Sequence, residues 1–209
     1  MIRQDLISYI EGEILPRYDG FDAAHRRNHA EKVIGESIRL CRQAGLDEEM
    51  AYTIAAYHDI GLSEGREYHH TSSARMVRQD DMLRSWFSEE QIEIIADAAE
   101  DHRASSKSEP RTMYGRIVAE ADRSIEPEEI IRRTVQYGLT NYSHLDYEGH
   151  WRRTVEHLEE KYAEGGYLKL WFPESENGQQ LNILREIIAD RAALRLLFEQ
   201  IFSEECIRE

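Results

Sequence analysis

Residues 55–61 read AAYHDIG, and this stretch ends a predicted helix with a histidine and an aspartate side by side. The apolar residues before the pair, with Asp47 as a candidate N-cap, predict a helix over 48–59. Gly61 lets the chain leave that helix directly after the polar pair. A His-Asp dipeptide alone carries little information, so its weight depends on what the rest of the chain places around it.

Helical periodicity dominates the remaining sequence. Only 4 Pro and 12 Gly punctuate 209 residues, and alternating β-branched runs are scarce. We predict helices over residues 2–15, 23–44, 48–59, 68–83, 88–102, 113–123, 126–137, 147–163 and 178–202. The aromatic stretch 165–173 is too short for a helix and is expected to be a packed loop rather than an extended lid. The prediction is an all-α fold, with residues 1–209 forming a single compact domain.

Composition excludes several classes of protein. The formal charge of −15 argues against a nucleic-acid polymer as partner, although a small anionic substrate in a locally basic cleft stays open. Cys41 and Cys206 stand far apart without CxxC spacing, which excludes a disulfide framework and a cysteine-rich zinc site. No secretory segment opens the chain and no apolar run approaches 18 residues, so we expect a cytoplasmic protein with no membrane partner.

Histidines and aspartates recur at the ends and faces of five successive predicted helices. A single helical histidine usually belongs to the surface or the core. An ordered series is harder to obtain by accident, and helices packed around a common centre can direct such side chains toward a metal ion. Imidazole and carboxylate are suitable ligands for divalent ions. The series consists of His29, His58, Asp59, His69, His102 and Asp122.

The series resembles the HD superfamily of metal-dependent phosphohydrolases over roughly residues 20–140. The resemblance rests on His29 one turn before Val33, on the AAYHDIG segment, and on the aspartate that ends VAEAD at residues 118–122. It implies an HD-domain helical bundle over about 20–140 and a C-terminal helical extension over about 141–209. It also implies a divalent metal ion held by His29, His58, Asp59 and Asp122.

Further histidines are similar to those of two-metal subgroups, which include the bacterial HD-type diadenosine tetraphosphate hydrolases and the cyclic-di-GMP phosphodiesterases. His69 lies four residues before Ser73 and is preferred to His70 as the matching ligand, and His102 matches the next histidine. Residues 122–127, in which an aspartate precedes Ile-Glu-Pro, resemble the diadenosine group. No Gly-Tyr-Pro signature follows His102, which disfavours a cyclic dinucleotide. The expectation is one or two ions, with Fe, Mn, Ni, Zn and Mg undistinguished.

The resemblance implies hydrolysis of a phosphoester or phosphoanhydride of a nucleotide or small phosphorylated metabolite, by attack of a metal-activated water. Asp59 would bridge the two ions, and Glu64, in the following loop, is a candidate to orient water or donate a proton. Candidate phosphate contacts are His25, one turn before His29, and three cations after His102, namely Arg103, Lys107 and Arg111. A surface histidine and a solvated basic loop are the alternatives. His144, His150 and His157 are expected on the surface.

Two rival functions stay open at this point. The same ligands would serve an HD-fold di-iron oxygenase that activates dioxygen instead of water. They would also serve a non-enzymatic, metal-binding regulatory protein. The cations after His102 favour hydrolysis. A homodimer is possible, but the sequence does not determine the oligomeric state.

Overall fold

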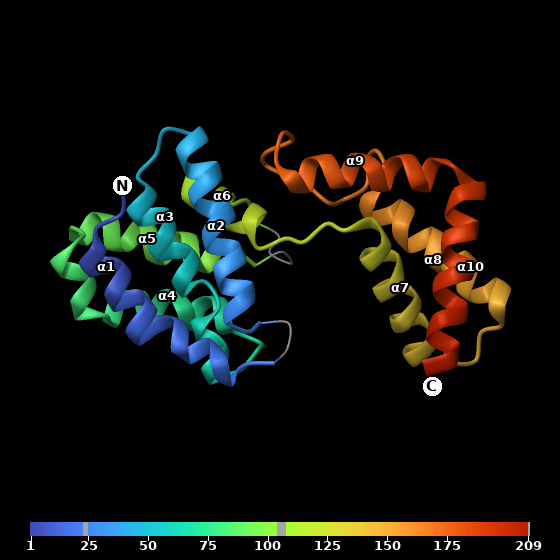
Figure 1. Ribbon diagram of the computed structural model, residues 1–209, viewed down its shortest axis with the longest axis horizontal. Helices are drawn as coiled ribbons and strands as arrows, with labels where there is room; N and C mark the ends of the chain where they lie inside the picture. The colour runs from blue at the N-terminus through green and yellow to red at the C-terminus, as the bar shows by residue number, and fades with distance from the viewer. Residues whose placement is uncertain (23–24, 104–107, 209) are drawn as a thin grey trace. The chain divides into compact units, whose positions relative to one another are not determined.

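The computed structural model describes residues 1–22, 25–103 and 108–208, and within these ranges the chain forms helices and no strand (Figure 1). The all-α prediction is confirmed. Contacts divide the chain into two compact units, Met1–Arg123 and Ser124–Glu209. The division follows Arg123, whereas the expected core extended to about residue 140. A single domain over the whole chain stays a prediction.

The described residues of the first unit form six α-helices and four short irregular helices. The predicted helix over 2–15 is divided, because a short α-helix continues as a π-helix and then a 3₁₀ segment that contains Pro16. The elements are α1 (Gln4–Tyr9), the π-helix Ile10–Ile14, the 3₁₀ helix Leu15–Gly20, α2 (Arg27–Gln43), α3 (Glu48–Tyr57), the 3₁₀ helix Ile60–Glu64, α4 (His69–Gln79), the 3₁₀ helix Asp81–Ser85, α5 (Glu89–Asp101) and α6 (Met113–Ala121).

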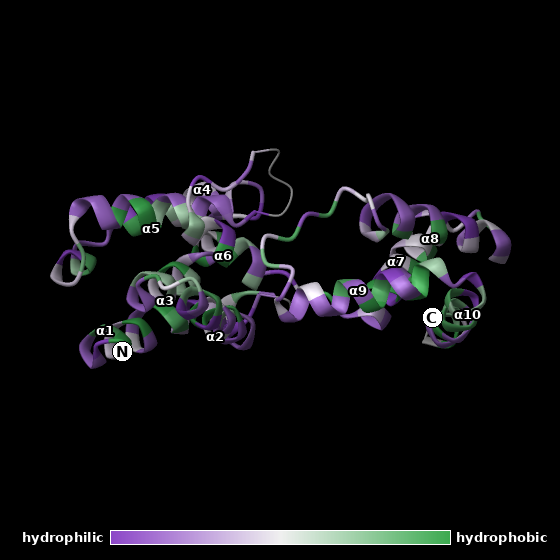
Figure 2. Ribbon diagram, turned by 90° about the horizontal axis from the view of Figure 1, so that it is seen from above, coloured by the Kyte–Doolittle hydropathy of each residue, from purple (hydrophilic) through white to green (hydrophobic). Residues whose placement is uncertain are grey.

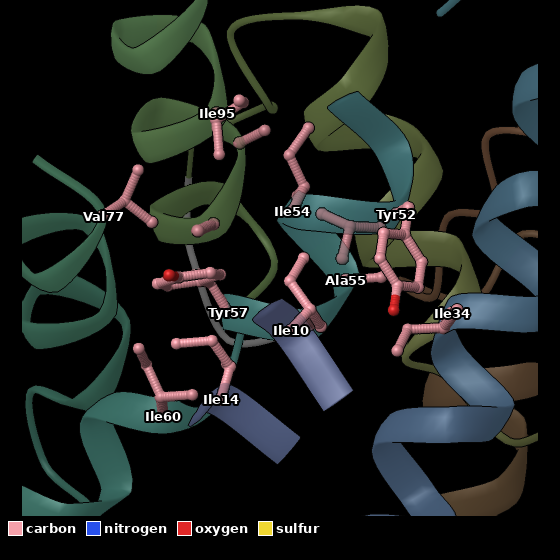
Figure 3. Packing of buried hydrophobic residues seen from close by; sticks show 14 of the residues in the cluster. Ile10, Ile14, Ile34, Tyr52, Ile54, Ala55, Tyr57, Ile60, Val77 and Ile95 are labelled. Carbon is pink, nitrogen blue, oxygen red and sulfur yellow. The ribbon is translucent and has the colours of Figure 1, made fainter. Parts of the chain in front are cut away.

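Helix α3 is the centre of the first unit. Every residue from Met50 to Tyr57 is buried, so this helix is covered on all sides rather than on one stripe. It packs against α2, α5 and α6, and Figure 3 shows Ile54 and Tyr57 surrounded by side chains from other elements. The end of α3, which carries His58 and Asp59, is therefore held in the interior of the unit.

Two predicted helix caps are present. The Asp47 carboxylate accepts a hydrogen bond from the Glu49 amide at 2.9 Å and begins α3. Ser88 and Gln91 form a reciprocal capping box at the start of α5. These caps satisfy amide groups that have no partner within the helix.

The second unit contains four amphipathic helices, along which hydrophilic and hydrophobic residues alternate (Figure 2). They are α7 (Pro127–Asn141), α8 (Tyr147–Tyr162), α9 (Glu176–Ala189) and α10 (Arg191–Arg208). The predicted single helix over 178–202 is wrong. Asp190 interrupts it with an extended backbone, and its carboxylate accepts hydrogen bonds from the Ala192 and Ala193 amides, each at 3.0 Å. An aspartate within an apolar pattern therefore acts as an N-cap.

The second unit has its own hydrophobic cluster, in which Leu158, Leu184 and Phe198 are fully buried. Leu168 and Leu170 pack against this cluster from a stretch without helix, in agreement with the packed-loop prediction. The surface prediction holds for His144 but not for His150, which is 5% exposed and lies beside the Phe202 ring. No helix among the described residues is long and apolar enough to span a membrane.

Candidate metal centre

Helix ends of the first unit bring the predicted ligands together. His29 lies in the first turn of α2, and His69 is the first residue of α4. His58, His102 and Asp122 are the residues that directly follow the last residues of α3, α5 and α6. Each of these side chains thus lies at an end of a regular helix, which is how a rigid scaffold fixes a site.

The first group contains His29, His58, Asp59 and Asp122, and one ligand atom from each lies within 4.8 Å of all the others. The His29 Nε2 atom lies 3.0 Å from Asp122 Oδ1 and 3.4 Å from His58 Nε2. The Asp59 Oδ2 atom lies 3.3 Å from His58 Nε2 and 3.9 Å from His29 Nε2. Two imidazoles and two carboxylates thus converge on one point.

The second group contains Asp59, His69 and His102, and it uses the other oxygen of the same carboxylate. Asp59 Oδ1 lies 3.3 Å from His69 Nε2 and 3.3 Å from His102 Nε2. The two imidazole Nε2 atoms are 3.2 Å apart. The Asp59 carboxylate therefore lies between the groups and turns one oxygen to each.

Backbone carbonyl groups orient three of the four imidazoles. The Nδ1 atoms of His58, His69 and His102 lie 2.7, 2.8 and 2.6 Å from the carbonyl oxygens of Ala55, Arg66 and Ala99, three residues earlier in each case. A carbonyl only accepts, so each Nδ1 carries the hydrogen and each neutral ring keeps its Nε2 lone pair for the centre. Converging lone pairs and carboxylates fit a divalent cation.

Nearby imidazoles keep the two carboxylates of the first group ionised despite their burial. Burial alone would raise the pKa of Asp59, but His58 and His102 hold it far below its usual range. Burial would likewise raise the pKa of Asp122, and the neighbouring His29 and His58 side chains lower it. Both carboxylates are therefore ionised at neutral pH, as metal ligands must be.

Gly61 allows α4 to approach the end of α3. A Cβ atom at this position would lie 2.1 Å from the His69 carbonyl oxygen and 2.6 Å from the Ser73 amide nitrogen. The Gly61 amide donates a hydrogen bond of 2.9 Å to the Ser73 hydroxyl. This close contact brings His69 to Asp59, and any larger residue at position 61 would push the two apart.

The structure separates the two adjacent histidines at the start of α4. His69 lies 3.3 Å from Asp59 Oδ1, whereas His70 belongs to neither ligand group of the described residues. The His70 Nδ1 atom instead lies 3.5 Å from the Arg103 guanidinium. This arrangement agrees with the preference for His69, and its role as a ligand stays a prediction.

Glu64 does not have the surroundings of a catalytic acid. Its exposed carboxylate pairs with the Arg75 guanidinium, which lowers its pKa, and the Ser72 hydroxyl lowers it further. A group that donates a proton near neutral pH needs a raised pKa. The structure therefore gives the predicted catalytic role no support and indicates a surface ion pair.

The cations predicted as phosphate contacts after His102 have different partners in the structure. Arg111 forms ion pairs with three carboxylates of α5, those of Asp97, Glu100 and Asp101, so its guanidinium is held against α5 and is not a free phosphate contact. Arg103 donates a hydrogen bond of 2.8 Å to the Glu67 carbonyl oxygen and directly follows His102. Lys107 lies outside the described residues.

His25 lies beside the first ligand group. Its ring centroid is 6.0 Å from that of His29, and its Nδ1 atom lies 2.8 Å from an Asp22 carboxylate oxygen. The side chain is 20% exposed, so it lies at the rim of the site. This position agrees with a substrate contact, which stays a prediction.

Two residues near the ligands were not singled out from the sequence. Tyr18 is fully buried, and its hydroxyl lies 3.2 Å from the Asp59 amide nitrogen. Burial, reinforced by the Asp59 charge, raises the pKa of Tyr18 well above its usual value, so the hydroxyl stays neutral. Arg123 follows Asp122, and burial lowers the pKa of its guanidinium while Glu120 and Asp122 oppose that effect. No motif marked Tyr18, and the resemblance over residues 122–127 gave Arg123 no role.

The comparisons with known proteins add one finding to this geometry. No curated protein and no solved structure matches the chain. In the comparison with protein families, residues 26–125 match the HD domain, and this segment contains all six residues of the two ligand groups.

Proposed function

We propose that this protein is a metal-dependent phosphohydrolase that holds two divalent ions between its six converging ligands. HD domains form a superfamily of metal-dependent phosphohydrolases, and the match covers all six residues. The observation that carries the proposal is the position of Asp59, whose Oδ1 and Oδ2 atoms face different histidine groups. A carboxylate in that position is suited to bridge two ions.

Each of the six ligands would have a defined role in the proposed two-ion site. His29, His58 and Asp122 would hold one ion, His69 and His102 the other, and Asp59 both. Two divalent ions would supply concentrated positive charge and Lewis acidity for the attack of water on a phosphoryl group. The chain itself provides rigid orientation, because each side chain extends from a helix end and three imidazoles are held by backbone carbonyls.

The substrate we propose is a nucleotide or a small phosphorylated metabolite. Arg103, next to His102, and His25, next to His29, flank the two ligand groups and can contact phosphate oxygens. A formal charge of −15 disfavours a nucleic-acid polymer, because long-range attraction to a phosphate backbone needs a basic surface. Dinucleoside polyphosphates are one group of substrates to test among others.

The test combines metal analysis with a substrate panel. The purified 209-residue chain is loaded with Mn²⁺ or Fe²⁺ and offered nucleoside mono-, di- and triphosphates, dinucleoside polyphosphates and sugar phosphates, with phosphate or nucleotide release as readout. The expected result is metal-dependent hydrolysis that a chelator abolishes. Oxygen consumption by the Fe²⁺-loaded protein without any hydrolysis would overturn the proposal in favour of an oxygenase.

A further inference from the structure

Tyr18 is a buried polar group behind the metal ligands that the proposed reaction does not use. It belongs to the 3₁₀ helix Leu15–Gly20, far in sequence from the residues that it contacts. Its side chain is fully buried, and its ring lies against that of His58, with centroids 6.2 Å apart. The hydroxyl donates to the Ala56 carbonyl oxygen at 3.0 Å and accepts from the Asp59 amide at 3.2 Å.

These two hydrogen bonds take the place of bonds that a longer α3 would make. In a continuing helix, the Asp59 amide would donate to the Ala55 carbonyl and the residue-60 amide would donate to the Ala56 carbonyl. Here the His58 imidazole donates to the Ala55 carbonyl, while the Tyr18 hydroxyl satisfies both the Asp59 amide and the Ala56 carbonyl. The helix can therefore end at the ligand pair without leaving these buried groups unsatisfied.

We propose that Tyr18 is a positioning residue, whose hydroxyl fixes the backbone of Asp59 so that the carboxylate faces both ligand groups. The proposal rests on the proposed two-ion site. The Asp59 backbone is not helical, with φ −112° and ψ 3°, so the helix alone does not define where its side chain points. A hydrogen bond from its own amide to a buried hydroxyl restrains that orientation. The second ion depends most on it, because Oδ1 of Asp59 is the carboxylate oxygen of the second group.

The test is Tyr18→Phe, which keeps the ring and removes the hydroxyl, and Tyr57→Phe is the matched control. Tyr57 is also a buried tyrosine of the first unit, but its hydroxyl donates to Asp80 rather than to a ligand backbone. Tyr18→Phe loses two buried hydrogen bonds and Tyr57→Phe loses its bond to Asp80, so both variants should lose thermal stability. Mn²⁺ is titrated into the chelator-treated full chain, and free Mn²⁺ is measured by electron paramagnetic resonance.

Wild type and Tyr57→Phe should bind two Mn²⁺ with similar affinity, whereas Tyr18→Phe should bind the second Mn²⁺ at least about 10-fold more weakly. Unchanged binding by Tyr18→Phe, or an equal loss in Tyr57→Phe, would overturn the proposal. The readout is metal binding and not hydrolysis. A wild type that binds two Mn²⁺ but hydrolyses nothing therefore overturns the proposed function, and the Mn²⁺ affinities of the two variants still decide the role of Tyr18. A wild type that binds no Mn²⁺ overturns both.

A second measurement needs no variant and covers the case in which Tyr18→Phe fails to fold. The amide proton of Asp59 is bonded to a buried hydroxyl, so amide hydrogen exchange by nuclear magnetic resonance should show strong protection of this amide, both without metal and with the diamagnetic ion Zn²⁺. Protection similar to that of the buried α3 amides supports the proposal. Rapid exchange of the Asp59 amide in the folded protein overturns it.

Discussion

The Nε2 atoms of His69 and His102 lie 3.2 Å apart, and neither neutral ring can donate a hydrogen to the other. Both rings use Nδ1–H for a backbone carbonyl, so two lone pairs face each other beside the Asp59 carboxylate. Such an arrangement becomes favourable when a cation lies between the three groups. It is the strongest sign of a second ion position in the described residues.

We predict that His69→Ala and His102→Ala each lower the metal content from about two ions per chain to about one, because each removes one of three ligands of the second group. Mass spectrometry of the purified proteins provides the measurement. His70→Ala is the matched control, because the His70 imidazole is adjacent in sequence to His69 but lies outside both ligand groups. This variant should keep two ions per chain. Loss of metal in His70→Ala but not in His69→Ala would reverse the assignment.

Asp59→Asn should abolish activity, or reduce it by at least roughly 10- to 100-fold, while leaving the helix content intact. The amide has nearly the shape of the carboxylate but lacks its charge, so it cannot bridge two cations. Glu64→Gln should keep near-wild-type activity, because Glu64 forms an exposed ion pair with Arg75. The activity of both variants is measured as the steady-state rate of hydrolysis of the substrate found in the panel. A large loss in Glu64→Gln would restore Glu64 as a catalytic acid.

The residues that converge could be named from the sequence because they stand near the ends of recognisable helices and because their spacing resembles that of the HD superfamily, and their role as ligands stays a prediction. His58 and Asp59 follow an apolar helix that begins at an N-cap, and Gly61 stands two residues after the pair, so these signals lie within a short segment. The other ligands stand at the ends of further recognisable helices. Which of His69 and His70 faces the centre could not be decided in the same way, since adjacent helical residues differ by about 100° in direction and the neighbouring helices select one.

Other features depend on residues that are distant in sequence. Tyr18 contacts backbone atoms 38 and 41 residues away, and no side-chain pattern marks a backbone partner. Arg111 belongs to a loop that reads as basic, yet the acidic side of α5 neutralises its charge. The interruption at Asp190 is hidden within an apolar helical period. In each case tertiary packing or side-chain chemistry overrides the local sequence signal.

Gly61→Ala should destabilise the first unit by about 1–3 kcal/mol or more, because the new Cβ would meet backbone atoms of α4 that cannot move independently. Gly35→Ala is the matched control. Gly35 lies exposed in the middle of α2, and a Cβ added there would have no neighbouring atom within 4 Å, so alanine should stabilise by about 0.5–1 kcal/mol. Thermal unfolding followed by circular dichroism compares the two. If Gly61→Ala melts like wild type, the close approach of α4 is not required.

Cys41 should make the stability of the first unit sensitive to alkaline pH. Burial, with a smaller effect of Asp47, raises the pKa of its thiol from 9.0 to about 11. The unfolded chain therefore loses this proton at lower pH than the folded protein does. The stabilisation is complete below pH 9 and is lost between about pH 9 and 11, which amounts to roughly 2–3 kcal/mol.

Thermal unfolding at pH 8, 9, 10 and 11 tests this expectation by comparing wild type with Cys41→Ala. Tyr9, whose pKa burial and Asp80 raise to about 12, contributes to the alkaline slope of both proteins, so their difference isolates the thiol. The cavity left by the alanine lowers the midpoint at pH 8, and this deficit should shrink as the pH rises to 11. Cys206→Ala, which removes the exposed thiol, should follow wild type at every pH. A deficit for Cys41→Ala that stays constant from pH 8 to 11 would mean that the Cys41 thiol ionises equally readily in the folded and unfolded chain.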